Sequence, residues 1–188
     1  MARQKDFDVN DVVKKATEVF WHQGFDATSM TDLTDAMGIY RKSLYDTFGD
    51  KHQLYMKCLA QYEMQAFERL QAVYNNEHSL LSRAKKIFDE AISNGTKGCL
   101  LINTATELAQ SDEEIRAFLT ENFMKQEQFF IKIIDEAKEN QELSNLTDSK
   151  VLADFIINAW AGLRVLVKFN TDEQMLQAIV KQNLELLK

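Results

Sequence analysis

The chain has 188 residues, a formal net charge of -7 at pH 7 and a hydrophobic content of 45%. It contains no proline and 6 glycines, whereas a sheet-rich protein needs many turn residues, so the composition favours an all-α fold with a sizeable core. Two cysteines are too few for a disulfide framework or a zinc site, and we expect no cofactor or metal. Without an N-terminal signal or an apolar run of the roughly 18 residues that a membrane helix needs, we expect a cytoplasmic protein with no membrane partner.

The charge is distributed unevenly along the chain. Residues 1–57 hold 8 Lys and Arg against 9 Asp and Glu, and the remainder holds 14 against 20. A protein that coats nucleic acid without specificity would need a strongly basic surface. Affinity for DNA must therefore come from a few well-placed cations and from doubling the contacts in a dimer.

The N-terminal part predicts three short helices. The first covers about residues 10–23 and ends at Gly24, because glycine accepts the left-handed conformation at a helix end. The second follows the N-cap Ser29 and is broken by Gly38, and the third covers about residues 41–48. Two short helices joined by a glycine turn form a helix-turn-helix, whose second helix can enter the major groove of DNA.

The rest of the chain predicts longer helices. Asp50 is the expected N-cap of a helix over about residues 51–75, whose pattern shows no break and so belongs to both parts of the chain. Further helices are expected at about residues 80–94, 99–110, 112–140, 148–169 and 172–187. Ser111, Thr147 and Thr171 are the expected N-caps of the last three.

Residues 20–59 resemble the N-terminal domain of the TetR family of bacterial transcriptional regulators. The matching stretches are FWHQGFDATSMTDLTDAMGI and SLYDTFGDKHQLY, and GCLLINTATELA at residues 98–109 is similar to a stretch in one branch of the family. The resemblance implies a DNA-binding domain at residues 1–52 and an effector-binding and dimerisation domain at residues 53–188. It also implies a homodimer that releases its operator when a small effector binds the larger domain.

The candidate DNA contacts lie on the third helix and at the N-termini of the second and fourth. Arg41 and Lys42 stand where side chains reach base edges first, and Arg41 could contact a guanine through two hydrogen bonds. The full candidate set is Thr28, Ser29, Thr31, Tyr40, Arg41, Lys42, Ser43, Tyr45 and Lys51. The alternatives are solvated charges, helix caps and a packed tyrosine.

Two positions depart from the family pattern. Tyr40 stands where the family often has serine or threonine, and its ring and hydroxyl could lie along the sugar-phosphate backbone. Asp46 would repel phosphate, so it either accepts from a cytosine amino group or points away toward Lys42 or another neighbour. These departures leave the base preference open.

Cys99 follows Gly98 at the expected start of a helix and beside Lys97, where the helix dipole and the cation favour a thiolate. It is a candidate sensor of electrophiles or oxidants, and the alternative is a small buried apolar residue. Asn103 and Glu107 share its helix face and could anchor an effector. The candidate effector-binding residues are Tyr62, Phe88, Cys99, Asn103, Glu107, Phe123 and Trp160, whose aromatic members belong to an ordinary core in the alternative.

The resemblance places the dimer contacts on the last two helices, where apolar residues repeat at helical spacing. The candidate interface residues are Phe155, Trp160, Leu163, Leu176, Ile179 and Leu184. We therefore predict a homodimeric, ligand-responsive repressor of a palindromic operator. The alternatives are a helical interaction protein with a non-functional DNA-reading head, which Asp46 and the acidic balance favour, and a thiol enzyme using Cys99. No nucleophile elbow, phosphate-binding glycine loop or metal-ligand spacing supports an enzyme.

Overall fold

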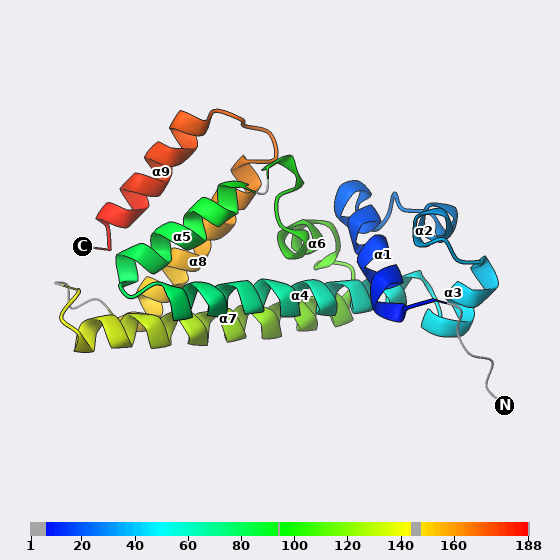
Figure 1. Ribbon diagram of the computed structural model, residues 1–188, viewed down its shortest axis with the longest axis horizontal. Helices are drawn as coiled ribbons and strands as arrows, with labels where there is room; N and C mark the ends of the chain where they lie inside the picture. Colours follow the sequence, from blue (N-terminus) through cyan, green and yellow to red (C-terminus); the bar gives the residue numbers. More distant parts are fainter. Residues whose placement is uncertain (1–6, 94, 144–147, 188) are drawn as a thin grey trace.

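The computed structural model describes residues 7–93, 95–143 and 148–187, and these residues form nine α-helices, one short 3₁₀-helix and no strand (Figure 1). The helices are α1 Val9–Gln23, α2 Met30–Met37, α3 Arg41–Phe48, α4 Lys51–Asn76, α5 Leu80–Ser93, α6 Leu100–Leu108, α7 Glu113–Glu139, α8 Ser149–Leu166 and α9 Glu173–Glu185, with the 3₁₀-helix η1 at Gly95–Lys97. The predicted all-α fold is confirmed.

Local capping residues set the bounds of the short N-terminal helices. Ser29 and Asp32 exchange hydrogen bonds in a capping box at the start of α2, which satisfies two N–H groups that the helix leaves free. Gly24 and Gly38 follow α1 and α2 with φ angles of 83° and 69°, which residues with a Cβ rarely adopt. The predicted bounds of α3 and the predicted N-cap Asp50 of α4 are also found.

The predicted N-caps of the last three helices need correction. An aspartate one residue further along the chain caps each of them, Asp112 for α7, Asp148 for α8 and Asp172 for α9. Ser111 and Thr171 are therefore not the caps, and Thr147 lies outside the described residues. Hydroxyl and carboxylate side chains both cap, but a carboxylate also interacts favourably with the helix dipole, so the aspartate wins where the two are adjacent.

Two hydrophobic clusters form the core and meet on α4. The reading-head cluster consists of the buried apolar residues of α1, α2, α3 and α6, with Leu54, Tyr55, Cys58, Leu59 and Tyr62 of α4, and with Cys99 and Ile115. The bundle cluster consists of those of α5, α8 and α9, with Leu70 and Val73 of α4, Phe130, Ile133, Ile134 and Ala137 of α7, and Val167 and Leu187. Figure 1 shows α4 and α7 side by side, with α1–α3 at one end and α5, α8 and α9 over the other.

The end of α6 is hydrogen-bonded to the turn before α2. The Glu107 carboxylate accepts the backbone N–H groups of Phe25 and Asp26 at 3.0 and 2.8 Å. A Cβ on Gly24 would lie 3.0 Å from the same carboxylate, so glycine at this position also leaves room for Glu107. This contact holds the helix-turn-helix to the larger part of the chain.

Two further polar contacts cross the same junction. The Tyr55 hydroxyl on α4 is 2.7 Å from the Thr104 hydroxyl on α6, and both side chains are buried. His52 Nε2, one turn earlier on α4, is 2.8 Å from the carboxylate of Asp112, which caps α7. Both helices of the larger part that reach this end are therefore attached to the start of α4.

Candidate DNA-binding surface and ligand cavity

The α3 helix packs through one face and leaves the other open. Leu44 and Phe48 are buried one turn apart against the reading-head cluster. The residues exposed around them are Tyr40, Arg41, Lys42, Tyr45 and Asp46, with Tyr40 85% exposed. Eight residues with one buried face and one open polar face provide a probe of the width that the major groove admits.

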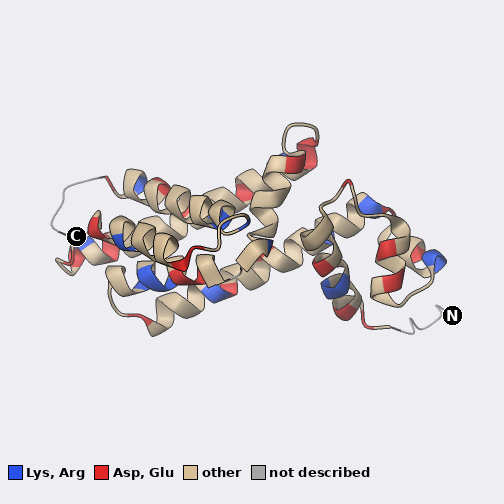
Figure 2. Cartoon of the chain, turned by 90° about the horizontal axis from the view of Figure 1, so that it is seen from above, with Lys and Arg blue, Asp and Glu red and all other residues tan. Residues whose placement is uncertain are grey.

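The charges on this surface are mixed rather than uniformly basic. Arg41 Nη2 donates to the Tyr45 hydroxyl at 3.4 Å, so these two side chains lie together one turn apart. Asp46 is exposed, and the described residues give it no ion pair, so the alternative that it pairs with Lys42 finds no support. Figure 2 shows both signs of charge on the N-terminal lobe. Binding here must depend on individual contacts rather than on a basic patch.

One predicted DNA contact needs correction, and a second has partners of its own. Thr28 is 1% exposed and its hydroxyl donates to the carbonyl of Gly24 at 2.6 Å, so it holds the turn before α2. The Lys51 ammonium group donates to the carbonyls of Phe25 and Thr28 at 2.8 and 2.9 Å. Only its third proton would be left for a phosphate. A sequence pattern does not reveal these carbonyl acceptors, and Lys51, which is partly exposed, stays a predicted phosphate contact.

The other hydroxyl candidates are differently placed. Ser29 and Thr31 are exposed at the start of α2, and the Ser29 hydroxyl is shared with Asp32 in the capping box. Ser43 lies partly buried on α3. These three remain candidates for backbone contacts, since hydroxyl and N–H groups at a helix N-terminus can bind phosphate.

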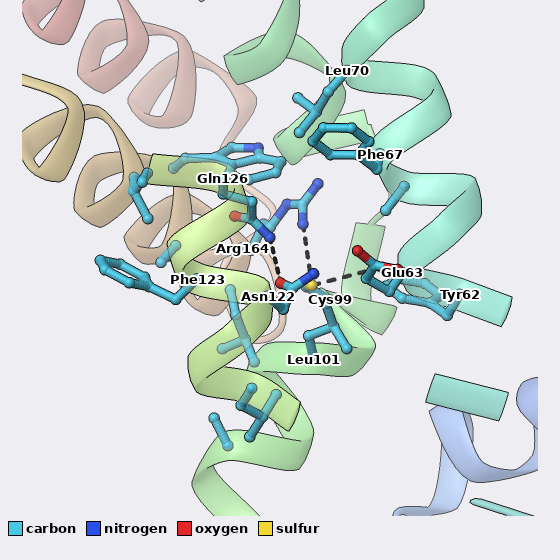
Figure 3. Close-up of a pocket in the computed structure, with 17 residues that line it drawn as sticks. Tyr62, Glu63, Phe67, Leu70, Cys99, Leu101, Asn122, Phe123, Gln126 and Arg164 are labelled. Atoms are coloured by element: carbon cyan, nitrogen blue, oxygen red, sulfur yellow. Dashed lines mark hydrogen bonds between the residues drawn. The ribbon is translucent and has the colours of Figure 1, made fainter. Parts of the chain in front are cut away.

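A cavity of about 240 Å³ lies where the two hydrophobic clusters meet. Residues of α4, α6, α7 and α8 line it, together with Cys99 just before α6 (Figure 3). Most lining side chains are apolar, and the exceptions are Glu63, Asn122, Gln126 and Arg164. An apolar cavity with a few polar groups is the usual form of a small-molecule site.

Arg164 is the cation in this lining, and it is 8% exposed. Its Nη1 donates to the Cys99 sulfur at 3.1 Å, and its guanidinium carbon lies 3.8 Å from the centre of the Trp160 ring. The Tyr62 hydroxyl also donates to the Cys99 sulfur, at 3.6 Å, and Figure 3 shows both contacts. Burial raises the pKa of the Tyr62 hydroxyl above its usual range, so it stays a donor at neutral pH.

The structure separates the candidate effector-binding residues into two groups. Tyr62, Cys99, Phe123 and Trp160 line the cavity. Phe88, Asn103 and Glu107 do not, and they are corrected here. Phe88 is fully buried in the bundle cluster, Asn103 bonds the Lys97 carbonyl and the Lys168 ammonium group, and Glu107 bonds the turn before α2. Helical spacing placed Asn103 and Glu107 on the Cys99 face, but Cys99 precedes the helix.

The cation beside Cys99 also differs from the expectation. Lys97 is adjacent in sequence, but its ammonium group lies 2.8 Å from Glu18 on α1. Arg164 takes its place from a helix 65 residues away in the chain. Arg164 was not among the predicted site residues, although it is a single charged residue one turn after Trp160 on an otherwise apolar helix face.

The expected dimer contacts divide into buried and partly buried residues. Trp160, Leu163 and Leu176 are buried in the bundle cluster of their own chain, so their place in the interface set is corrected. Phe155, Ile179 and Leu184 are partly buried against the same cluster. The face of α8 that remains exposed carries Val151, Asn158, Gly162 and Val165, and Phe169 follows it at 73% exposure. The most regular apolar stripe marks the internal core rather than the open face.

An exposed helix-turn-helix joined to a larger helical domain is the architecture of a DNA-binding regulator. The sequence matches the family described as bacterial regulatory proteins, tetR family, over residues 12–58. It matches the tetracyclin repressor-like C-terminal domain over residues 66–182. The chain belongs to the TetR family and is a DNA-binding transcriptional regulator.

Several relatives resemble the chain over nearly its whole length. It is 31% identical to the HTH-type transcriptional regulator YezE of Bacillus subtilis, with 100% of both chains covered. It is 26% identical to the HTH-type transcriptional repressor ComR of Escherichia coli, with 98% of this chain and 90% of ComR covered. A cysteine mutant of the regulator CifR, solved with a 26 bp double-strand operator DNA, superposes with a TM-score of 0.87 at 26% identity and covers 100% of both chains.

None of the described helices is both long enough and apolar enough to cross a membrane. Among the same residues, no group of three or more His, Cys, Asp and Glu side chains is placed to hold a metal ion.

Proposed function

We propose that the protein is a homodimeric, one-component repressor acting in the cytoplasm. Residues 1–52 bind a palindromic operator, residues 53–188 bind an effector and form the dimer, and a small molecule in the cavity or modification of Cys99 releases the DNA. The names of ComR as a repressor and of CifR as a protein solved with operator DNA support this proposal.

The observation that carries the proposal is the open face of α3. Tyr40, Arg41, Lys42 and Tyr45 are exposed together, while Leu44 and Phe48 fix the helix from behind. Such a helix presents its N-terminal side chains to base edges in the groove. A dimer would present two copies, which doubles the phosphate contacts available to a protein with so little positive charge.

The cavity supports the effector part of the proposal because its wall is connected to the reading head. Cys99 lines the cavity and is the N-cap residue of α6, and Glu107 in the last turn of α6 is bonded to the turn before α2. A ligand that shifts Cys99 would therefore act on a helix whose other end holds the helix-turn-helix. Differential contacts in two states are what a ligand needs to move an equilibrium.

A selection from a pool of random duplexes tests the DNA-binding part. We expect enrichment of a pseudo-palindrome whose half-sites are about 34–36 Å apart, or a comparable multiple-turn distance, with binding that weakens steeply as salt rises. Failure to enrich any duplex would contradict the proposal and favour a helical interaction protein.

The thiol part is tested by mass spectrometry with the operator so obtained. Treatment with an alkylating agent should add one group per subunit at Cys99 and release the DNA, while the Cys99→Ser variant should stay bound. Release of both proteins alike would exclude Cys99 as the sensor. Consumption of many equivalents of the electrophile would indicate an enzyme instead.

A further inference from the structure

We infer that the cavity takes a small carboxylate with an apolar body, held through its carboxylate by Arg164. The inference rests on the proposed function in one respect, because it names the effector class of the same cavity. It rests on the side chains that line the cavity and on the hydrogen-bond and ion-pair partners that two of them lack.

Arg164 is a buried charge without an anionic partner. It is 8% exposed, and no carboxylate of the described residues lies within ion-pair distance of its guanidinium group. Its Nε has no hydrogen-bond partner among these residues, and its Nη1 donates to a sulfur, which is a weak acceptor. A buried charge is costly unless it is paired and hydrogen-bonded, so the site lacks an anion.

Trp160 supplies a second unpaired donor in the same lining. Its Nε1 is buried and has no acceptor among the described residues, and its ring lies under the Arg164 guanidinium group. Both unsatisfied polar atoms of the lining are therefore donors. An incoming group that only accepts hydrogen bonds, as an ionised carboxylate does, fits this deficit.

The remaining polar side chains of the cavity already have partners. Gln126 donates to Asn122 at 2.6 Å. Glu63 lies 3.8 Å from the ammonium group of Lys125, which also lies 3.1 Å from Glu121 outside the lining. Of the two charged lining residues, Glu63 thus has an ion-pair partner, and Arg164 has none among the described residues.

The rest of the ligand is set by the apolar walls and by the volume. Phe67, Leu70, Leu101 and Ile157 belong to the lining, and they offer no hydrogen bond to a second polar group. A cavity of about 150 Å³ holds benzene, so about 240 Å³ suits a single ring or a short alkyl chain with a carboxylate. Larger acids and acids with a second charged group should be excluded.

Binding would also change the contact between Arg164 and Cys99. A carboxylate is a stronger acceptor than a thiol, so it would draw the guanidinium group away from the sulfur at the start of α6. This step links occupancy of the cavity to the helix that holds the reading head.

Isothermal titration of the DNA-free protein with matched ligands tests the inference. The probes are hexanoate, 2-ethylhexanoate, benzoate and phenylacetate, each compared with its amide and with the corresponding amine. We expect at least one acid to bind about tenfold or more tightly than its amide and its amine, the factor that a hydrogen-bonded charge contributes. Equal binding of acid and amide, tighter binding of the amine, or no binding by any acid would overturn it.

Two variants test whether the Arg164 guanidinium group is the charge that binds the carboxylate. Arg164→Met keeps an unbranched stem but removes the guanidinium group, and it should abolish the preference for the acid over the amide. Glu63→Gln is the matched control in the same lining and should keep that preference or increase it. The inference fails if Arg164→Met retains the preference or if Glu63→Gln loses it.

The melting temperature separates a ligand-binding arginine from a structural one. Removing an unpaired buried charge should leave the melting temperature of the unliganded Arg164→Met variant unchanged or raise it, whereas a structural arginine predicts a fall. The acid should raise the melting temperature of the unaltered protein only. If Arg164→Met does not fold, the acid-against-amide comparison on the unaltered protein still decides.

The selected operator keeps this inference apart from the proposed function. Acid binding at Arg164 without enrichment of any duplex would leave the ligand class standing and remove the repressor proposal. Enrichment of an operator without any preference for the acid would leave the DNA-binding proposal standing and remove the ligand class.

Discussion

Arg41 and Tyr45 are one turn apart on α3 and touch through a long hydrogen bond, so each restricts where the other can point. That restriction favours a guanidinium group already oriented when it meets a base edge, because less side-chain freedom is lost on binding. Individual side chains of this kind must supply the specificity, since the N-terminal part has no excess of positive charge.

We predict that Arg41→Ala relaxes the base preference at one position in each half-site. The loss of a bidentate contact corresponds to about 1–3 kcal/mol, or roughly 5- to 150-fold in discrimination at that position. The measurement is a duplex selection repeated with the variant. Lys181→Ala in α9 removes one positive charge far from α3 in the chain and serves as the control. An unchanged base preference in the Arg41 variant would count against its role.

Asp112 provides a pH-dependent prediction. The backbone N–H of Ile115 and then the His52 ring hold the pKa of this carboxyl below its usual value. A lowered folded-state pKa means that the stabilisation is complete above the unfolded value of 3.8 and is lost as the pH falls through the folded value.

The Asp112→Asn variant should therefore keep most of its stability at neutral pH, because asparagine caps a helix about as well as aspartate. It should show a shallower loss of stability below about pH 4, because it has no carboxylate to protonate. Denaturant unfolding at a series of pH values measures both effects. Asp35→Asn, which removes an exposed carboxylate on α2, is the control. If stability falls with pH in the same way below about pH 4 for the Asp112 variant and the unaltered protein, Asp112 is not a source of the acid sensitivity.

Among the elements, α6 has the most consequential position. It is short, with 9 residues, and its two ends are attached to different things: the cavity through Cys99 and the turn before α2 through Glu107. A short helix tied at both ends moves as one body, so its displacement at one end is felt at the other.

We predict that Glu107→Ala lowers the melting temperature and weakens the response of DNA binding to ligand. Two backbone N–H groups would lose a charged acceptor, which costs about 1–3 kcal/mol for each group left unsatisfied away from water and less where water replaces it. Thermal unfolding and operator titration with and without ligand measure the two effects. Glu113→Gln, a carboxylate 92% exposed at the start of α7, is the control. An unchanged ligand response would show that the contact does not transmit it.

The sequence predicted the elements well because capping boxes, glycine ends and apolar spacing act over a few residues. Ser29, Gly38 and the bounds of α3 are examples. The N-caps of α7 and α9 were wrong by one residue, where two capping side chains are adjacent, and the other corrections mainly concern partners distant in the chain. The carbonyl groups that accept hydrogen bonds from Lys51 lie 26 and 23 residues away in the chain. The N–H groups that donate to Glu107 lie 82 and 81 residues away, so no local sequence pattern indicates any of these contacts.

At the scale of the whole molecule, the proposed dimer needs an exposed face through which two copies meet. The exposed side of α8 carries Val151, Val165 and the small Gly162, and a Cβ on Gly162 would have no atom within 4 Å in one chain. This strip also holds Asn158, and the glycine between Asn158 and Val165 allows close approach of a second helix. We propose this strip, rather than the buried Trp160 and Leu163, as the dimer contact.

We predict that Val165→Glu gives a folded monomer that binds the operator weakly. Burying an unpaired carboxylate in the interface is unfavourable, while the same side chain in a monomer meets water. Sedimentation gives the mass, and circular dichroism reports the fold. Met124→Glu, which changes an exposed apolar residue on α7, should remain dimeric. A Val165 variant that stays dimeric would move the interface elsewhere.

The unbroken course of α4 has a mechanical consequence. From Ala66, which lines the cavity, to Lys51 at its start, the helix spans 15 steps, or about 22 Å at 1.5 Å for each residue. Pivoting such a rod by about 9° sweeps its far end through about 3.4 Å, the rise of one base pair along a DNA strand. Small angular changes around a bound molecule would thus put the two reading heads of a dimer out of step with their half-sites.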